Sequence, residues 1–120
     1  MPEPRVFIVV RNSRFDVSSA KEFGSVEFIF DSDDAVSPFD LPDVIMSIED
    51  ELSERDFDPS VDYVALTGPT IMVATLYAVV MGRYGTVRTL LFDARKEGYR
   101  ERSARVTRWP AGFGIKEAPL

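Results

Sequence analysis

Residues 62–82 form the stretch that most constrains the fold. They hold a short apolar run, the turn sequence Gly68-Pro69-Thr70, and a second, longer apolar run. The pattern predicts a strand over 62–67, a tight turn, and a helix over 71–84. That helix is apolar on almost every side, and such helices are buried on more than one side. In a chain of 120 residues it must pack on a sheet. We expect its other side to pack on a second copy, as a homodimer.

Strands and helical segments alternate along the rest of the chain. The run Arg5–Val10 is apolar without alternation after its first residue, which is typical of a strand buried on both faces. Further strands are predicted over 26–30, 86–92 and 99–107, and further helices over 16–24 and 43–54. This order predicts an α/β fold, a Rossmann-like three-layer sandwich with a mostly parallel five-stranded sheet. The expected strand order is 2-1-3-4-5 with an antiparallel edge strand. An antiparallel hairpin of the first two strands is the alternative.

Proline and glycine residues set the expected boundaries of the domain and of its helices and turns. We expect a single α/β domain over 1–108 and a loose C-terminal tail over 109–120, because the tail holds two Pro and two Gly. Pro42 fits the first turn of the helix that follows it. Gly24 and Gly85 suit the left-handed position after a helix, and Gly98 could supply a positive φ in the last turn.

The absence of cysteine and histidine excludes several functions. A disulfide framework, a structural zinc site and Ser-His or Cys-His catalysis all need residues that this chain lacks. Oxygen-ligand sites for Mg²⁺ or Ca²⁺ remain open, but we predict no metal site and no cofactor. We therefore expect binding rather than catalysis. No apolar run reaches eighteen residues and the first residues do not resemble a signal peptide, so we expect a cytoplasmic protein that does not enter a membrane.

Charge is unevenly distributed along the chain, whose net charge is −6. Residues 31–62 contain twelve acidic side chains and one basic one, whereas residues 83–108 contain eight basic and three acidic ones. The net sign disfavours general nucleic-acid binding, which depends on neutralising phosphates. The simplest interpretation is two solvated faces of opposite charge. The alternative function is an acidic protein-interaction module that binds a host protein through residues 31–62.

The predicted strand order places a candidate ligand site where that order reverses, beyond the carboxyl ends of the first and third strands. The Gly68–Thr70 turn opens the long helix, whose free N–H groups favour an anion there, and Thr70 could cap the helix or bond the ligand. Arg11 or Arg14 could add a charge-assisted bond to a phosphate. Asp93, at the end of the fourth strand, could approach the same crevice. The predicted ligand-binding residues are Arg11, Asn12, Ser13, Arg14, Thr67, Gly68, Pro69, Thr70 and Asp93, with no catalytic residues.

The segment Val64–Met72, the helix after it and the strand Val87–Phe92 resemble the nucleotide-sensing half of CRISPR-associated Rossmann-fold (CARF) domains. The resemblance covers about thirty residues and implies a cyclic oligonucleotide bound over the turn at a dimer interface. Pro69 stands where that family often has a second glycine, which removes one N–H donor. Overall the chain looks like the small proteins of phages and mobile elements. The leading expectation is non-enzymatic binding of a phosphate-bearing ligand such as a nucleotide or cyclic nucleotide messenger, with use as a phage sponge for a defence signal.

Overall fold

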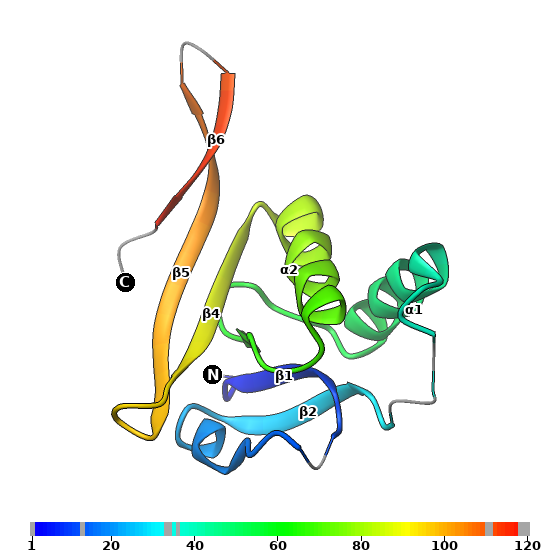
Figure 1. Ribbon diagram of the computed structural model, residues 1–120. Coiled ribbons are helices and arrows are strands. Elements are labelled where there is room, and N and C mark those ends of the chain that lie inside the picture. The colour runs from blue at the N-terminus through cyan, green and yellow to red at the C-terminus, as the bar shows by residue number, and fades with distance from the viewer. Residues whose placement is uncertain (1, 13, 33–34, 36, 110–111, 118–120) are drawn as a thin grey trace.

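A computed structural model describes residues 2–12, 14–32, 35, 37–109 and 112–117, with no account of the side chains after Val106. It shows an α/β fold built on one mixed sheet (Figure 1). The elements are β1 (Arg5–Val10), the 3₁₀ helix η1 (Ser18–Glu22), β2 (Ser25–Phe30), α1 (Leu41–Glu54), β3 (Tyr63–Ala65), α2 (Thr70–Tyr84), β4 (Thr86–Asp93), β5 (Gly98–Trp109) and β6 (Gly112–Glu117).

The sheet has six strands in the order β2-β1-β3-β4-β5-β6. The pairs β1–β2, β1–β3 and β3–β4 are parallel, whereas β4–β5 and β5–β6 are antiparallel. The predicted order of the first five strands and the antiparallel fifth strand are confirmed. The parallel β1–β2 pair excludes the hairpin alternative for these two strands.

The sequence analysis predicts a loose C-terminal tail and β5 as the edge strand, and the structure differs on both points. Residues 112–117 form β6, which pairs with β5 from Ala104 to Trp109. Strand formation is compatible with this composition because the two prolines of the segment, at positions 110 and 119, fall outside the strand. β4 pairs with β5 only as far as Arg105, so the later residues of β5 pair with β6 alone.

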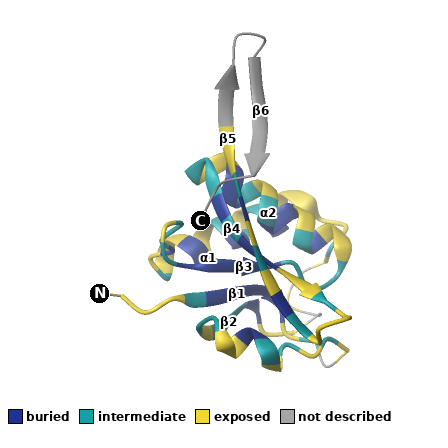
Figure 2. Ribbon diagram, turned by 90° about the vertical axis from the view of Figure 1, so that its left-hand side faces the viewer, coloured by how far each residue is buried: buried dark blue, intermediate teal, exposed yellow. Residues whose placement is uncertain are grey.

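The two faces of the sheet carry different layers. Both α-helices cover one face, where Val44, Ile48 and Leu52 of α1 join α2 in one apolar cluster. Phe7 of β1 and Val64 of β3 belong to the same cluster. On the opposite face the described part of the chain places one helix, the 3₁₀ helix η1. Its Ala20 packs with buried residues of the sheet: Val6, Ile8, Tyr63, Ala65, Leu90 and Tyr99. The central strands β1 and β3 are buried along most of their length (Figure 2).

Local signals explain where the helices begin and end. The side chain of Asp40 accepts a hydrogen bond from the backbone N–H of Asp43 at 3.3 Å, and Pro42 lies in the first turn of α1, as predicted. α2 ends at Gly85, which has the expected left-handed conformation, with φ of 73°.

The predictions of positive φ at Gly24 and Gly98 are wrong. In the β4–β5 turn Glu97 takes the positive φ, of 53°, in place of Gly98. Gly24 is required for a different reason, since a Cβ there would clash with the carbonyl oxygen of Pro4. The backbone of Pro4 occupies the space that a side chain at this position would fill. Neither α-helix in the part of the chain that the structure describes has the length and apolarity needed to cross a membrane.

Candidate functional site

A crevice lies beyond the carboxyl ends of β1, β3 and β4, in the region where the strand order reverses. It has a volume of about 340 Å³. The residues that line the crevice come from the loop after β1, the turn after β3, the end of β4 and the start of β5: Arg14, Phe15, Asp16, Leu66, Thr67, Gly68, Phe92 and Tyr99. Three of the predicted site residues, Arg14, Thr67 and Gly68, therefore lie together.

A pair of hydroxyl groups lies on one wall of the crevice. The Thr67 and Tyr99 oxygens are 2.8 Å apart, within hydrogen-bond distance. Tyr99 packs edge-on against Phe92, with ring centroids 5.4 Å apart. Burial raises the pKa of Tyr99, and the nearby Asp16 carboxylate adds to this effect, whereas the bond with Thr67 opposes it. Tyr99 is therefore neutral near pH 7 and able to donate one hydrogen bond.

Two opposite charges reach the same crevice. Arg14 is exposed, and its backbone N–H donates to the side-chain oxygen of Asn12 at 2.9 Å, which shapes the loop. Asp16 accepts hydrogen bonds from both the backbone N–H and the hydroxyl of Ser18, and these bonds lower the pKa of Asp16. The crevice thus presents one guanidinium and one carboxylate and is less purely cationic than the sequence suggested.

The turn from β3 into α2 forms the floor of the crevice. Gly68 has φ of 139°, and a Cβ there would lie 2.9 Å from a methyl carbon of Val9, so this position requires glycine. Pro69 is the N-cap residue of α2, and the helix has no side-chain cap. The expectation that Thr70 caps the helix is therefore wrong, because Thr70 is already the first helical residue. Its side chain is exposed and lines a separate hollow beside α2 rather than this crevice.

The other predicted site residues lie elsewhere. The guanidinium of Arg11 lies 4.3 Å from the centre of the Phe28 ring and does not line the crevice. Asp93 does not line it either, because its carboxylate binds the backbone N–H of Arg95 and the side chain of Arg100 within the β4–β5 turn. Ser13 lies outside the described residues.

Five lining residues were not expected from the sequence: Phe15, Asp16, Leu66, Phe92 and Tyr99. Phe15 and Asp16 follow the predicted Arg11–Arg14 loop directly, so a prediction that extended the loop by two residues would have included them. Phe92 and Tyr99 reach the crevice only because β4 and β5 pair as a hairpin. The antiparallel pairing of these strands was predicted, but no local sequence signal gives the register that places Tyr99 opposite Phe92. Within the described ranges no group of three acidic side chains is placed to hold a metal ion.

Comparisons with known proteins identify a family. Searches of curated proteins and of solved structures gave no significant match. The family model of the phage Pam3 gp32-like protein matches residues 4–106, from the residue before β1 to the end of the β4–β5 pairing. This match confirms the resemblance to small phage proteins, and it gives no support for the resemblance to CARF domains. The chain belongs to the phage Pam3 gp32-like protein family.

Proposed function

We propose that the crevice binds a small phosphate-bearing ligand, with a nucleotide or cyclic nucleotide as the preferred class. The observation that carries the proposal is the position of Arg14 beside the Thr67–Tyr99 hydroxyl pair in a hollow edged by aromatic rings. A guanidinium binds phosphate oxygens through charge-assisted hydrogen bonds. The hydroxyl pair suits a sugar or base edge, and the rings of Phe15 and Phe92 suit the face of a base.

The turn after β3 supports the phosphate end of the same ligand. Thr70 and Ile71 begin α2, and the N–H groups at the start of a helix favour an anion. This position corresponds to the turn over which cyclic oligonucleotides bind in the CARF domains that the segment resembles. In a Rossmann-like sheet the crevice at the strand reversal is also the usual ligand site. We propose use as a sponge for a nucleotide defence signal inside the infected host.

The structure provides a matched pair of variants to test this function. We expect Arg14→Ala to weaken nucleotide binding about tenfold or more, since bonds to a charged partner contribute about 1.5–3 kcal/mol. Arg11→Ala should leave the affinity unchanged, because Arg11 lies over Phe28 and outside the crevice. Titration calorimetry with a panel of nucleotides and cyclic nucleotides measures both. No binding by any member of the panel, or equal losses in the two variants, contradicts the proposal.

A second candidate function is supported by the exposure of Phe39. This ring is 96% exposed in the acidic segment 31–62, next to Asp40. An exposed aromatic ring among carboxylates is a typical anchor of a protein-binding surface. The candidate is an acidic module that binds a basic host protein. Capture of host proteins on the immobilised chain should fall with added salt and with Phe39→Ala, and capture that is unaffected by both excludes this surface.

A further inference from the structure

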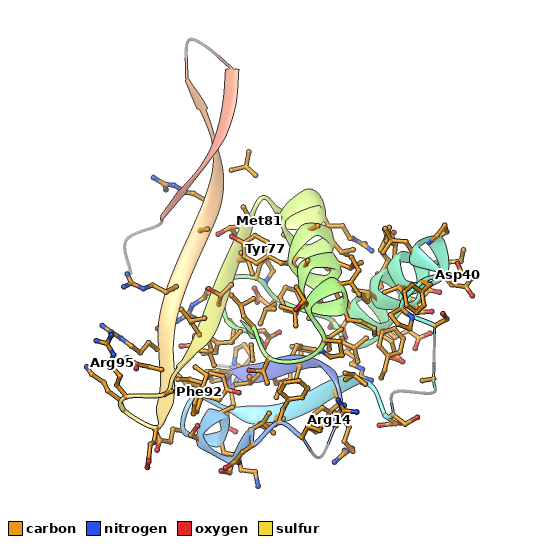
Figure 3. All side chains as sticks on the ribbon, in the orientation of Figure 1. Arg14, Asp40, Tyr77, Met81, Phe92 and Arg95 are labelled. Atoms are coloured by element: carbon orange, nitrogen blue, oxygen red, sulfur yellow. The ribbon has the colours of Figure 1, made fainter. Side chains whose placement is uncertain are left out.

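The face of the sheet beside α2 is left partly uncovered. α1 packs along one flank of α2, and on the other flank a hollow of about 470 Å³ lies open. Thr70, Val73, Ala74 and Tyr77 line this flank hollow with Leu66 and Gly68. The helical residues have the spacing i, i+3, i+4, i+7, so they form one side of α2. Figure 3 shows Tyr77 projecting from α2 toward β4.

The uncovered face continues across β4 and β5. Leu66 donates its backbone N–H to the carbonyl of Leu90 at 2.9 Å, and the next residue, Leu91, pairs with Arg100. Val87 packs in the cluster that contains α2, and side chains alternate along a strand, so Leu91 lies on that same face. Leu91 is 49% exposed. The Arg100 guanidinium lies 3.4 Å from the Asp93 carboxylate, yet its side chain is 52% exposed, so part of the guanidinium still faces solvent. Leu66, Leu91 and Arg100 define the receptor strip, an apolar surface with a basic edge.

The outward side of α1 has the complementary character. Asp43, Met46, Asp50 and Glu54 are exposed at the spacing i, i+3, i+7, i+11, so they form one stripe along the helix. We call this set the α1 stripe. Met46 is 59% exposed, and its three acidic neighbours form no ion pair within the described part of the chain.

The two surfaces lie on opposite sides of one molecule. α1 packs on α2, and α2 packs on β4. In Figure 3 Asp40, at the start of α1, and Arg95, in the β4–β5 turn, lie at opposite sides of the protein. One copy can therefore present its α1 stripe to a neighbour while its receptor strip receives the stripe of another. Contacts between two different surfaces of identical chains generate rings or filaments, whereas self-complementary surfaces close as dimers.

We propose that this chain assembles head to tail, with the α1 stripe of one copy docked on the receptor strip of the next. Met46 enters the flank hollow, where its flexible thioether fits an apolar lining. The stripe carboxylates face Arg100, and opposite charge on the two surfaces sets the orientation. Leu66 and Gly68 line both the flank hollow and the ligand crevice, but Met46 and Arg100 do not line the crevice, so variants at these two residues test the assembly alone. The inference gives the α1 stripe a second copy as its partner, whereas the acidic-module candidate gives Phe39 a host protein.

Two charge reversals test the interface. Sedimentation velocity of the wild type should show assemblies that grow with concentration and dissociate with added salt. Asp50→Arg and Arg100→Glu should each raise the concentration needed for assembly about tenfold or more, because like charges meet across the interface. Mixing the two variants should restore assembly of alternating copies. In that mixture an unchanged stripe meets an unchanged strip and an Asp50→Arg stripe meets an Arg100→Glu strip, so opposite charges face each other at both kinds of contact.

Controls separate the interface from general charge effects and from misfolding. Lys21→Glu and Glu22→Arg change exposed charges on η1, on the other face of the sheet, and should leave assembly unchanged. Met46→Lys should reduce assembly as the reversals do, and circular dichroism confirms that each variant is folded. A wild type that is monomeric at all concentrations overturns the inference, as does assembly that both reversals leave unchanged. If the protein is monomeric but still captures host protein through Phe39, the head-to-tail assembly is wrong and the acidic-module candidate stands.

Discussion

Replacing Asp62 with alanine is expected to lower the free energy of unfolding by about 3 kcal/mol, because it breaks a buried ion pair. Asp62 is 1% exposed. One of its carboxylate oxygens accepts hydrogen bonds from the backbone N–H and Nε of Arg5, at 3.2 and 3.3 Å. The other accepts from Nη2 of Arg5 and the backbone N–H of Asp58, both at 2.8 Å. The variant leaves these donors without their partner, and urea denaturation measures the loss.

The same guanidinium ties the end of α1 to this carboxylate. Arg5 donates to the backbone carbonyls of Arg55 and Asp56 at 2.6 and 3.0 Å, and its bond to Asp62 raises the pKa of Arg5. Glu22→Ala is the matched control, since this exposed carboxylate of η1 forms no ion pair within the described residues, and it should change stability by less than about 0.5 kcal/mol. Equal losses of stability in the two variants would contradict the role assigned to the Arg5–Asp62 ion pair.

Gly68→Ala should also destabilise the protein by about 3 kcal/mol. A residue with a side chain is strained at φ of 139°, and the added methyl group would lie 2.9 Å from Val9, which is fully buried in β1. Backbone strain of this kind costs about 1–3 kcal/mol, and overpacking of a core costs a similar amount. Thermal unfolding followed by circular dichroism measures the change.

Gly82→Ala is the matched control for this substitution and should have the opposite sign. Gly82 lies inside α2, and no atom lies within 4 Å of the position that its Cβ would occupy. Alanine there should stabilise the helix by about 0.5–1 kcal/mol. A Gly68→Ala variant as stable as the wild type would show that the turn tolerates a side chain. Gly68 would then be needed for ligand binding rather than for the stability of the fold.

Much of the fold could be predicted because the central strands have unambiguous sequences. Residues Val6–Val10 are apolar without interruption, and all are buried in the centre of the sheet. The crossover rule then gave the order of five strands. β6 was missed because glycine and proline lower strand propensity, and its pairing with β5 depends on tertiary structure rather than on local sequence. The bond between Arg5 and Asp62 was missed for a similar reason, since 57 residues separate the two.

The sequence could predict where the candidate site lies but not which side chains line it. The reversal of strand order indicated the crevice, and Arg14, Thr67 and Gly68 line it. Arg11 was assigned there because it follows β1 directly, yet the Phe28 ring holds its guanidinium over β2. Tyr99 could not be assigned, because its distance from Thr67 depends on the register of the β4–β5 hairpin. Strand order follows from general rules, whereas side-chain direction depends on individual neighbours.

The place of β1 in the sheet also has a consequence for synthesis. β1 leaves the ribosome before the other strands of this sheet, yet it lies between β2 and β3, and β3 begins only at Tyr63. A nascent chain that ends before Tyr63 therefore has no partner for one edge of its most apolar strand. Unpaired edges and exposed apolar surface favour aggregation, and parallel pairs between distant segments form slowly. The time before Tyr63 is translated is thus the period in which this sheet most depends on chaperones.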